Sequence, residues 1–234
     1  MSQGQFVPYG PYIDIINAVG KWKVVDLKSL SELCSYKLNY SNLRKKVRKL
    51  EDFGLVKSVN LGRKRKHLFL TNSGIKFTQY DQTYELCDES LSHDVIVGNV
   101  LRSFLGFPNF VNGRMFHEIP DNDLAPDALV TGIKTKREYE LAIEVELTQK
   151  SSTRVKSKYS RYLRSKSFDY CIFITNKEGL FRTYKRFLGE MNTDVQSKII
   201  LMYAPDLSPN EFSFYASECH FKGQTKKFEE IFGE

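Results

Sequence analysis

The chain has 234 residues, enough for one or two domains that each bury a core of their own. Its 41 % hydrophobic and 27 % charged residues are ordinary for a globular protein and exclude wholesale disorder. No apolar run reaches the roughly 18–20 residues of a membrane span, and residues 1–10 lack the basic and apolar segments of a signal peptide. We therefore expect a cytoplasmic protein that has no membrane partner.

The net charge of +7 is distributed unevenly along the chain. Residues 1–80 contain 15 Lys and Arg against 5 Asp and Glu, whereas the remainder contains 20 against 23. The first part therefore carries a net charge of +10 and the second a net charge of −3. This asymmetry predicts a module that binds a polyanion, joined to a domain that is rich in carboxylates. The four cysteines lie far apart, so no zinc or disulfide motif is expected.

The first 80 residues show the periodicity of three helices followed by a hairpin. In the third helix apolar residues recur at i, i+4 and i+7, and Gly54 follows where a helix-ending glycine is expected. The expected helices cover residues 11–19, 27–33 and 40–53, and the expected hairpin strands cover 55–60 and 66–70. This order resembles a winged helix-turn-helix domain, and the resemblance spans about residues 9–80.

Basic side chains lie on the third helix and at the tip of the hairpin, the two elements that contact DNA in a winged helix. Cations on two separate elements can neutralise several phosphates at once, which predicts salt-dependent binding of double-stranded DNA. The expected DNA contacts are Asn42, Arg44, Lys45, Arg48, Lys49, Arg63, Lys64, Arg65 and Lys66. A solvated basic face, a contact with protein and a contact with RNA are the alternatives.

The second part, residues 83–234, alternates strand and helix patterns, which predicts an α/β sheet covered on both faces. We expect its first helix to begin near residue 84 and residues 80–89 to join the domains 1–82 and 83–234 as continuing helix. The further expected helices cover residues 151–165 and 178–191. The expected strands cover residues 114–119, 127–133, 138–147, 169–175 and 198–204, with an edge strand over 212–216.

The strand over residues 138–147 carries acidic residues on one face. Period-2 alternation places Glu144 and Glu146 on that face, about 7 Å apart, in the most apolar part of the strand. Carboxylates held this close repel one another unless a cation or a shared proton neutralises them. Asp127 opens the preceding strand and offers a third carboxylate. An exposed sheet face is the alternative interpretation of the two glutamates.

This arrangement resembles the PD-(D/E)XK nuclease superfamily. There an Asp and a Glu on neighbouring hairpin strands bind Mg²⁺ or Mn²⁺, and a Lys lies two residues beyond the Glu. Pro126-Asp127 and Glu144 match the first two elements, but Glu146 stands at the lysine position. The resemblance implies an α+β winged helix followed by a nuclease-like mixed sheet flanked by helices.

Two interpretations of Glu146 remain open. It is either a third metal ligand, with the missing cation supplied by Lys158 or Lys150, or the mark of a degenerate site that keeps the fold without the chemistry. A surface role is the alternative for Lys158. The resemblance implies that Asp127, Glu144, Glu146 and Lys158 form the catalytic set, with the three carboxylates as metal ligands.

The pattern Pro-Asp-Ala, then Ile-Glu-Val-Glu, then a helix with Lys-Tyr and Arg-Tyr-Leu is also similar to the replication-relaxation family of mobile-element proteins. In that family a winged helix precedes a nuclease-like domain, and an acidic residue commonly takes the lysine position. The same domain order resembles restriction enzymes that act on modified DNA. His93 and Asp94 fall on the apolar face of the first helix, where this fold often supplies a polar residue near the metal. A hydrogen-bonded core pair is the alternative.

We therefore expect a DNA-binding protein of the plasmid or mobile-element type that cuts or nicks DNA with Mg²⁺ or Mn²⁺. Its expected partners are DNA and either a second copy of the chain or other replication and mobilisation proteins. The alternative is a non-catalytic transcription or replication regulator whose degenerate nuclease-like domain mediates assembly. An RNA-directed nuclease or an anti-phage effector with the same chemistry is a third possibility.

Overall fold

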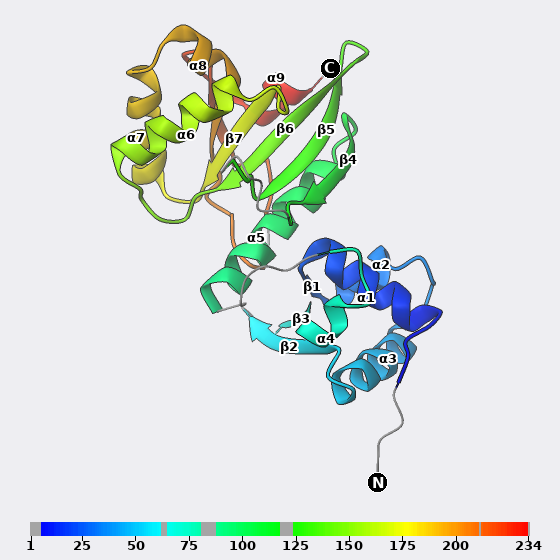
Figure 1. Ribbon diagram of the computed structural model, residues 1–234. Coiled ribbons are helices and arrows are strands. Elements are labelled where there is room, and N and C mark those ends of the chain that lie inside the picture. The colour runs from blue at the N-terminus through cyan, green and yellow to red at the C-terminus, as the bar shows by residue number, and fades with distance from the viewer. Residues whose placement is uncertain (1–5, 62–64, 81–87, 118–123, 211, 234) are drawn as a thin grey trace. The chain divides into compact units, whose positions relative to one another are not determined.

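The computed structural model describes residues 6–61, 65–80, 88–117, 124–210 and 212–233. The chain divides into two compact units, Met1–Gly98 and Asn99–Glu234 (Figure 1), and each is described by itself below. The division falls within the helix α5 (Asp88–Leu105). The predicted boundary after residue 82 and most of the predicted connecting helix lie outside the described residues. Each helix within the described ranges is too short or too polar to span a bilayer.

The amino-terminal unit packs helices against a three-stranded antiparallel sheet ordered β1-β3-β2. The third helix and the hairpin lie where the sequence predicts them. The strand β1 is too short to show a periodicity and was not predicted. The elements are α1 (Pro11–Trp22), β1 (Val24–Asp26), α2 (Leu27–Leu33), α3 (Tyr40–Asp52), β2 (Val56–Leu61), β3 (Arg65–Leu70) and α4 (Asn72–Ile75).

Side-chain caps fix the amino-terminal ends of α2 and α3. The Asp26 carboxylate accepts hydrogen bonds from the first backbone N–H groups of α2, and the Asn39 side chain accepts one from the Asn42 N–H at 2.9 Å. After α3 the chain reverses through Gly54, whose φ of +66° suits glycine. The predicted apolar stripe of α3 is buried, so its basic residues lie on the remaining surface of the helix.

The carboxy-terminal unit contains a seven-stranded mixed sheet ordered β10-β9-β8-β7-β6-β5-β4. The three central strands β6, β7 and β8 are parallel, and the other neighbours pair antiparallel. The strands are β4 (Phe110–Met115), β5 (Ala128–Lys134), β6 (Arg137–Val145), β7 (Tyr170–Thr175), β8 (Ile199–Tyr203), β9 (Glu218–Phe221) and β10 (Gln224–Lys227).

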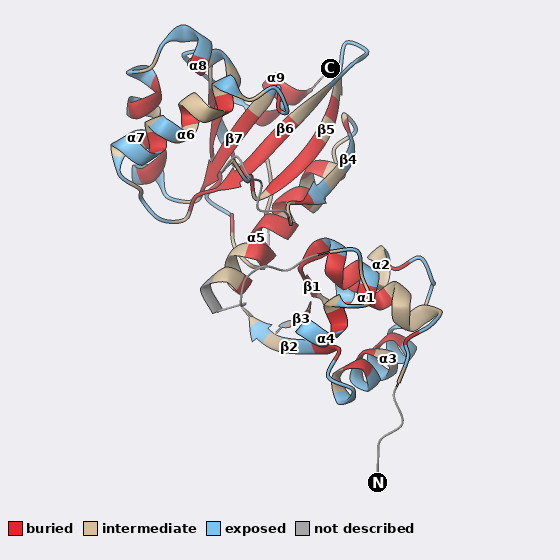
Figure 2. Ribbon diagram, in the orientation of Figure 1, coloured by how far each residue is buried: buried red, intermediate tan, exposed pale blue. Residues whose placement is uncertain are grey.

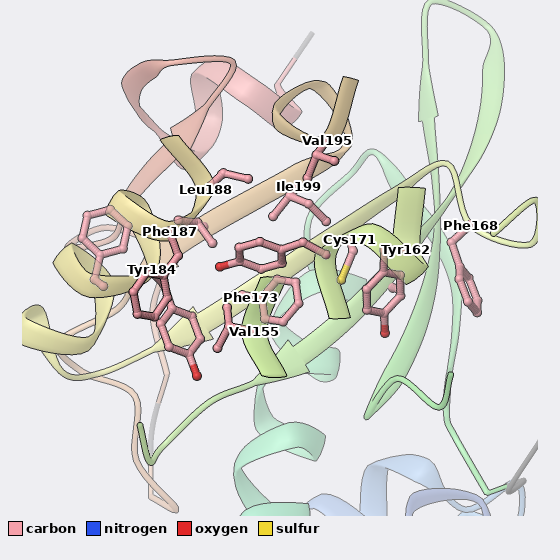
Figure 3. Close-up of a cluster of buried hydrophobic side chains, with 14 of the residues drawn as sticks. Val155, Tyr162, Phe168, Cys171, Phe173, Tyr184, Phe187, Leu188, Val195 and Ile199 are labelled. Atoms are coloured by element: carbon pink, nitrogen blue, oxygen red, sulfur yellow. The ribbon is translucent and has the colours of Figure 1, made fainter. Parts of the chain in front are cut away.

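Helices cover both faces of this sheet, as predicted, and the central strands are buried (Figure 2). One face, called the α6 face below, is covered by α6 (Ser152–Arg164), α7 (Glu178–Gly189) and α8 (Thr193–Lys198). Figure 3 shows its core, in which Tyr162 lies beside Cys171 and Phe168. On the opposite face the carboxy-terminal half of α5 and α9 (Phe228–Phe232) meet through aromatic rings. The predicted fold class, a mixed sheet flanked by helices, is thus confirmed.

Two predicted strands are wrong. The strand expected over residues 114–119 is β4, which begins four residues earlier and ends at Met115; residues 118 and 119 lie outside the described part of the chain. The residues 212–216 form no edge strand. Instead the Phe214 ring stacks on Phe228 with centroids 3.7 Å apart, and the edge of the sheet is the polar hairpin of β9 and β10.

Candidate active site

The three predicted carboxylates come from neighbouring strands on the α6 face of the sheet. Ala128 pairs with Ile143, and the Asp127 N–H donates to the Ile143 carbonyl at 2.9 Å, which continues the register and sets Asp127 opposite Glu144. Because side chains alternate along a strand, Glu146 shares the face of Glu144. The β5–β6 register therefore brings the three carboxylates to one end of this strand pair.

Glu144 is buried among polar partners from α6. Its residue is 2 % exposed, its Oε2 lies 2.7 Å from Lys158 Nζ, and its Oε1 accepts a hydrogen bond from the Tyr162 hydroxyl. Lys158 Nζ also lies 3.8 Å from Glu146 Oε1, and Glu146 is 9 % exposed. The exposed-face interpretation of Glu144 and Glu146 is therefore wrong. The ammonium group of Lys158 lies near both carboxylates, and its positive charge offsets the repulsion expected from their close spacing.

The environment changes the proton affinity of these groups. Burial raises the pKa of Glu144 to about 7; the ammonium of Lys158 acts in the opposite direction, and Asp127 adds to the increase. Burial by itself lowers the pKa of Lys158, but the carboxylates of Glu144, Asp127 and Glu146 together outweigh burial and hold this pKa above its usual value. Burial also raises the pKa of Tyr162 far above its usual value, so its hydroxyl keeps its proton and acts as a donor.

Asp127 is held by the backbone of the neighbouring strand. Its Oδ2 accepts a hydrogen bond from the Val145 N–H at 2.7 Å, which fixes the half-buried carboxylate beside β6. The alternative cation Lys150 is placed differently, because its Nζ donates to Thr148 Oγ1 at 3.0 Å. Of the two lysines considered from the sequence, Lys158 is thus the one that the structure places in contact with the carboxylates.

The donor set has the right chemistry for a hard divalent cation, since carboxylate oxygens are the ligands that Mg²⁺ prefers. As placed, however, no group of three or more His, Cys, Asp or Glu side chains within the described ranges is ready to hold a metal ion. The Lys158 ammonium takes one oxygen of Glu144 and the Tyr162 hydroxyl takes the other. A metal ion would therefore have to compete with Lys158 for this carboxylate.

His93 and Asp94 lie in the amino-terminal unit. Asp94 is 7 % exposed, and its Oδ1 lies 3.9 Å from both Lys23 Nζ and His93 Nδ1. The neighbouring residues Leu91 and Val95 pack against the sheet of this unit. The part of α5 that carries Asp94 thus supplies the amino-terminal unit with a buried acid that is paired with a lysine.

The basic residues of α3 fall into two groups. Arg44, Lys45 and Arg48 are exposed, as is Asn42 at the start of the helix. Lys49 Nζ lies 4.8 Å from the centre of the Phe6 ring, which places its ammonium against the aromatic segment before α1. The four predicted basic DNA contacts on α3 are thus all exposed, and the ammonium of one of them, Lys49, also lies over an aromatic ring.

The predicted wing is described only in part. Arg63 and Lys64 lie outside the described residues. Arg65 is exposed, and Lys66 Nζ lies 2.8 Å from Glu51 Oε2, which ties the part of β3 nearest the turn to the end of α3.

Sequence reasoning missed the contribution of Tyr162 to the site. Its spacing predicts only a core position, and the residue is indeed fully buried. The available signal was the choice of tyrosine over phenylalanine at a buried position that faces the acidic strand, since a buried hydroxyl needs a partner.

Comparisons with known proteins add little to this geometry. The chain is similar to the restriction endonuclease FokI. The match covers 75 % of this chain and 40 % of that chain, with 9 % identity and a TM-score of 0.27. The chain thus spans well under half the length of FokI. No protein-family model and no curated protein matches the sequence, so the resemblance to the replication-relaxation family stays a prediction.

Proposed function

We propose that this chain binds DNA and hydrolyses a phosphodiester bond at Asp127, Glu144, Glu146 and Lys158. The observation that carries the proposal is the position of the Lys158 ammonium, 2.7 Å from Glu144 and 3.8 Å from Glu146. A lysine beside an Asp–Glu pair is what the nuclease-like pattern requires, and β6 itself does not provide one. The helix α6 supplies it from the next element along the chain.

Each side chain has a defined part in this proposal. A Mg²⁺ or Mn²⁺ ion held by Asp127 and Glu144, with Glu146 as a further oxygen donor, would supply Lewis acidity and an activated water. Lys158 places a fixed positive charge where negative charge develops on the phosphoryl oxygens. The Tyr162 hydroxyl fixes the orientation of Glu144, and the Val145 N–H fixes that of Asp127. The exposed basic face of α3 delivers the DNA.

The test is the conversion of supercoiled plasmid DNA by the purified protein with Mn²⁺ or Mg²⁺. We expect metal-dependent nicking or linearisation by the natural chain and none by Asp127→Asn, which keeps the shape of the side chain but removes its charge. DNA binding by the variant should be retained, because Asp127 is not one of the basic residues expected to contact the phosphates. Cleavage that survives this substitution would show that the activity arises elsewhere or from a contaminant.

The non-catalytic regulator is the second candidate, and one observation favours it. Both oxygens of Glu144 already have partners, and no ready metal-binding group lies among the described residues. A metal that binds only the folded protein raises its melting temperature. Absence of both cleavage and stabilisation by millimolar Mn²⁺, with DNA binding retained, would favour a regulator. The finer assignment, to a plasmid or mobile element and to a homodimer or a replication partner, would then depend on which DNA site the protein binds.

For the DNA-binding face we expect the pair Arg44→Gln/Arg48→Gln to weaken binding and to lower the salt dependence of the affinity. Each lost phosphate contact reduces the slope of log K against log salt by about 0.9, so the slope should fall by nearly 2. The matched control is Lys28→Gln/Lys76→Gln, which removes the same charge from exposed lysines outside α3 and the hairpin. Fluorescence anisotropy with a labelled duplex measures both, and equal slopes for the two pairs would contradict this assignment.

A further inference from the structure

A basic cavity of about 930 Å³ opens on the α6 face of the carboxy-terminal sheet, over β4 and β5. Four cationic side chains line it, against one acidic side chain, Glu140, among its described lining residues. The Glu140 Oε1 accepts a hydrogen bond from Thr131 Oγ1 at 2.7 Å within the cavity floor. The four cations are Arg114 on β4, Arg161 and Arg164 on α6, and Lys166 just beyond α6.

The strand register places this basic cavity, called the groove below, next to the three carboxylates. Arg114 pairs with Leu129 on β5, and Leu129 pairs with Ala142 on β6, so these residues form one row across the α6 face. The next row on the same face holds Asp127 and Glu144. Residues two apart along a strand are separated by about 7 Å, so the floor of the groove begins one side-chain repeat from the proposed active site.

The helix α6 forms a wall that runs from the site into the groove. Lys158 contacts Glu144, and Arg161 and Arg164 follow at successive intervals of three residues. Residues three apart are neighbours on a helix surface. Lys158, the cation of the proposed active site, therefore lies on the same surface of α6 as two cations of the groove.

The charge pattern of the groove selects its ligand. Arginine side chains bind phosphate oxygens through two parallel hydrogen bonds, and a row of cations suits a ligand with regularly repeated phosphates. Another cavity of this unit, of about 750 Å³, has a mixed lining in which three acids balance most of the cations. A volume near 930 Å³ is in the range of cavities that hold small ligands, so the groove accommodates a short stretch of one strand.

We propose that the groove lined by Arg114, Arg161, Arg164 and Lys166 binds the phosphodiester backbone of a single DNA strand and leads it to Glu144 and Lys158. This inference rests on the proposed function, because it names the path by which the substrate of that site is held. It assigns the carboxy-terminal unit a DNA contact of its own, separate from the basic face of α3.

The test measures binding without cleavage, in the presence of a chelator, so that its result does not depend on nuclease activity. The full-length protein is titrated into labelled duplex and single-stranded DNA between about 50 and 200 mM salt. The groove variant is Arg164→Gln/Lys166→Gln, and both residues are exposed. The matched control, Arg182→Gln/Lys227→Gln, removes the same charge from exposed residues outside the groove.

We expect the groove variant to lower the salt slope by up to about 1.8 for duplex and about 1.4 for single-stranded DNA, and the control pair to leave both slopes unchanged. An equal decrease in both pairs would reflect net charge alone and would overturn the proposal. A decrease confined to duplex DNA would overturn the single-strand path. If the melting temperature of the groove variant falls, Arg114→Gln on β4 provides the same test from the other side of the groove.

The two proposals fail in different ways. If the natural chain cleaves no plasmid but the groove variant lowers the salt dependence of DNA affinity, the chain has the DNA groove without the proposed catalysis. If the natural chain cleaves plasmid but the groove variant leaves the salt dependence of DNA affinity unchanged, the chain holds its substrate elsewhere. This result would overturn the proposal that the groove binds DNA.

Discussion

The substitution Lys158→Met is expected to destabilise the carboxy-terminal unit by up to about 1.4 kcal/mol more at pH 8 than at pH 5, because it removes the cation that allows the buried Glu144 to ionise. Glu144 is 2 % exposed, and Lys158 provides the cation that lies 2.7 Å from its carboxylate. Methionine keeps most of the length and the apolar stem of lysine, so the loss of the ammonium is the main change.

The effect of this substitution should depend on pH. In the natural protein burial raises the pKa of Glu144 from 4.5 to about 7, so the proton on Glu144 favours folding below about pH 4.5, and this contribution is lost as pH rises through 7. Loss of the Lys158 ammonium, which acts to lower that pKa, moves it still higher. At pH 5 Glu144 is protonated in both proteins and the variant should be only mildly destabilised. The difference should arise above about pH 7, where the natural protein loses this proton and the variant keeps it.

Urea unfolding at pH 5 and at pH 8 measures this difference. The matched control is Lys156→Met on the same helix, whose partner Glu190 is fully exposed, and it should have no measurable effect at either pH. A loss of stability in Lys158→Met that is the same at both pH values would show that lost packing, not the buried charge of Glu144, dominates.

The site illustrates which features the sequence can predict. Strand alternation placed Glu144 and Glu146 on one face, and a proline–aspartate pair at the start of a strand placed Asp127 on the neighbouring one. Helical periodicity also placed Lys158 beside the apolar stripe of α6. These are one-dimensional patterns, and the structure brings all four residues together. Their catalytic and metal-binding roles remain predictions.

The remaining features depend on contacts between distant segments. Periodicity assigned Tyr162 to the core but could not indicate that its hydroxyl reaches Glu144. The aromatic run near Phe214 alternates like a strand, yet the Phe214 ring stacks on Phe228, which lies 14 residues later. The basic groove also escaped prediction, because Arg114 and Arg164 are far apart in sequence and only the packing of α6 on the sheet brings them to one cavity.

The role of Glu146 can be decided by moving the ammonium group from the helix to the strand. Loss of a preorganised cation that stabilises a transition state typically reduces the rate 10²–10³-fold, and we expect a cleavage loss of about this size in Lys158→Met. The double variant Lys158→Met/Glu146→Lys restores one cation near Glu144, in the position that the nuclease-like pattern assigns to lysine.

If Glu146 only replaces that lysine, the double variant should recover cleavage to within about tenfold of the natural chain, a difference of about 1.4 kcal/mol in activation free energy. It should recover stability at pH 8 as well, because Glu144 regains a positive partner. If Glu146 is a required oxygen donor to the metal, stability should return while cleavage stays lost. Plasmid cleavage and urea unfolding of the same preparations separate the two cases. Recovery of neither would mean that Glu144 depends on the helix-borne position of Lys158 and not simply on a nearby positive charge.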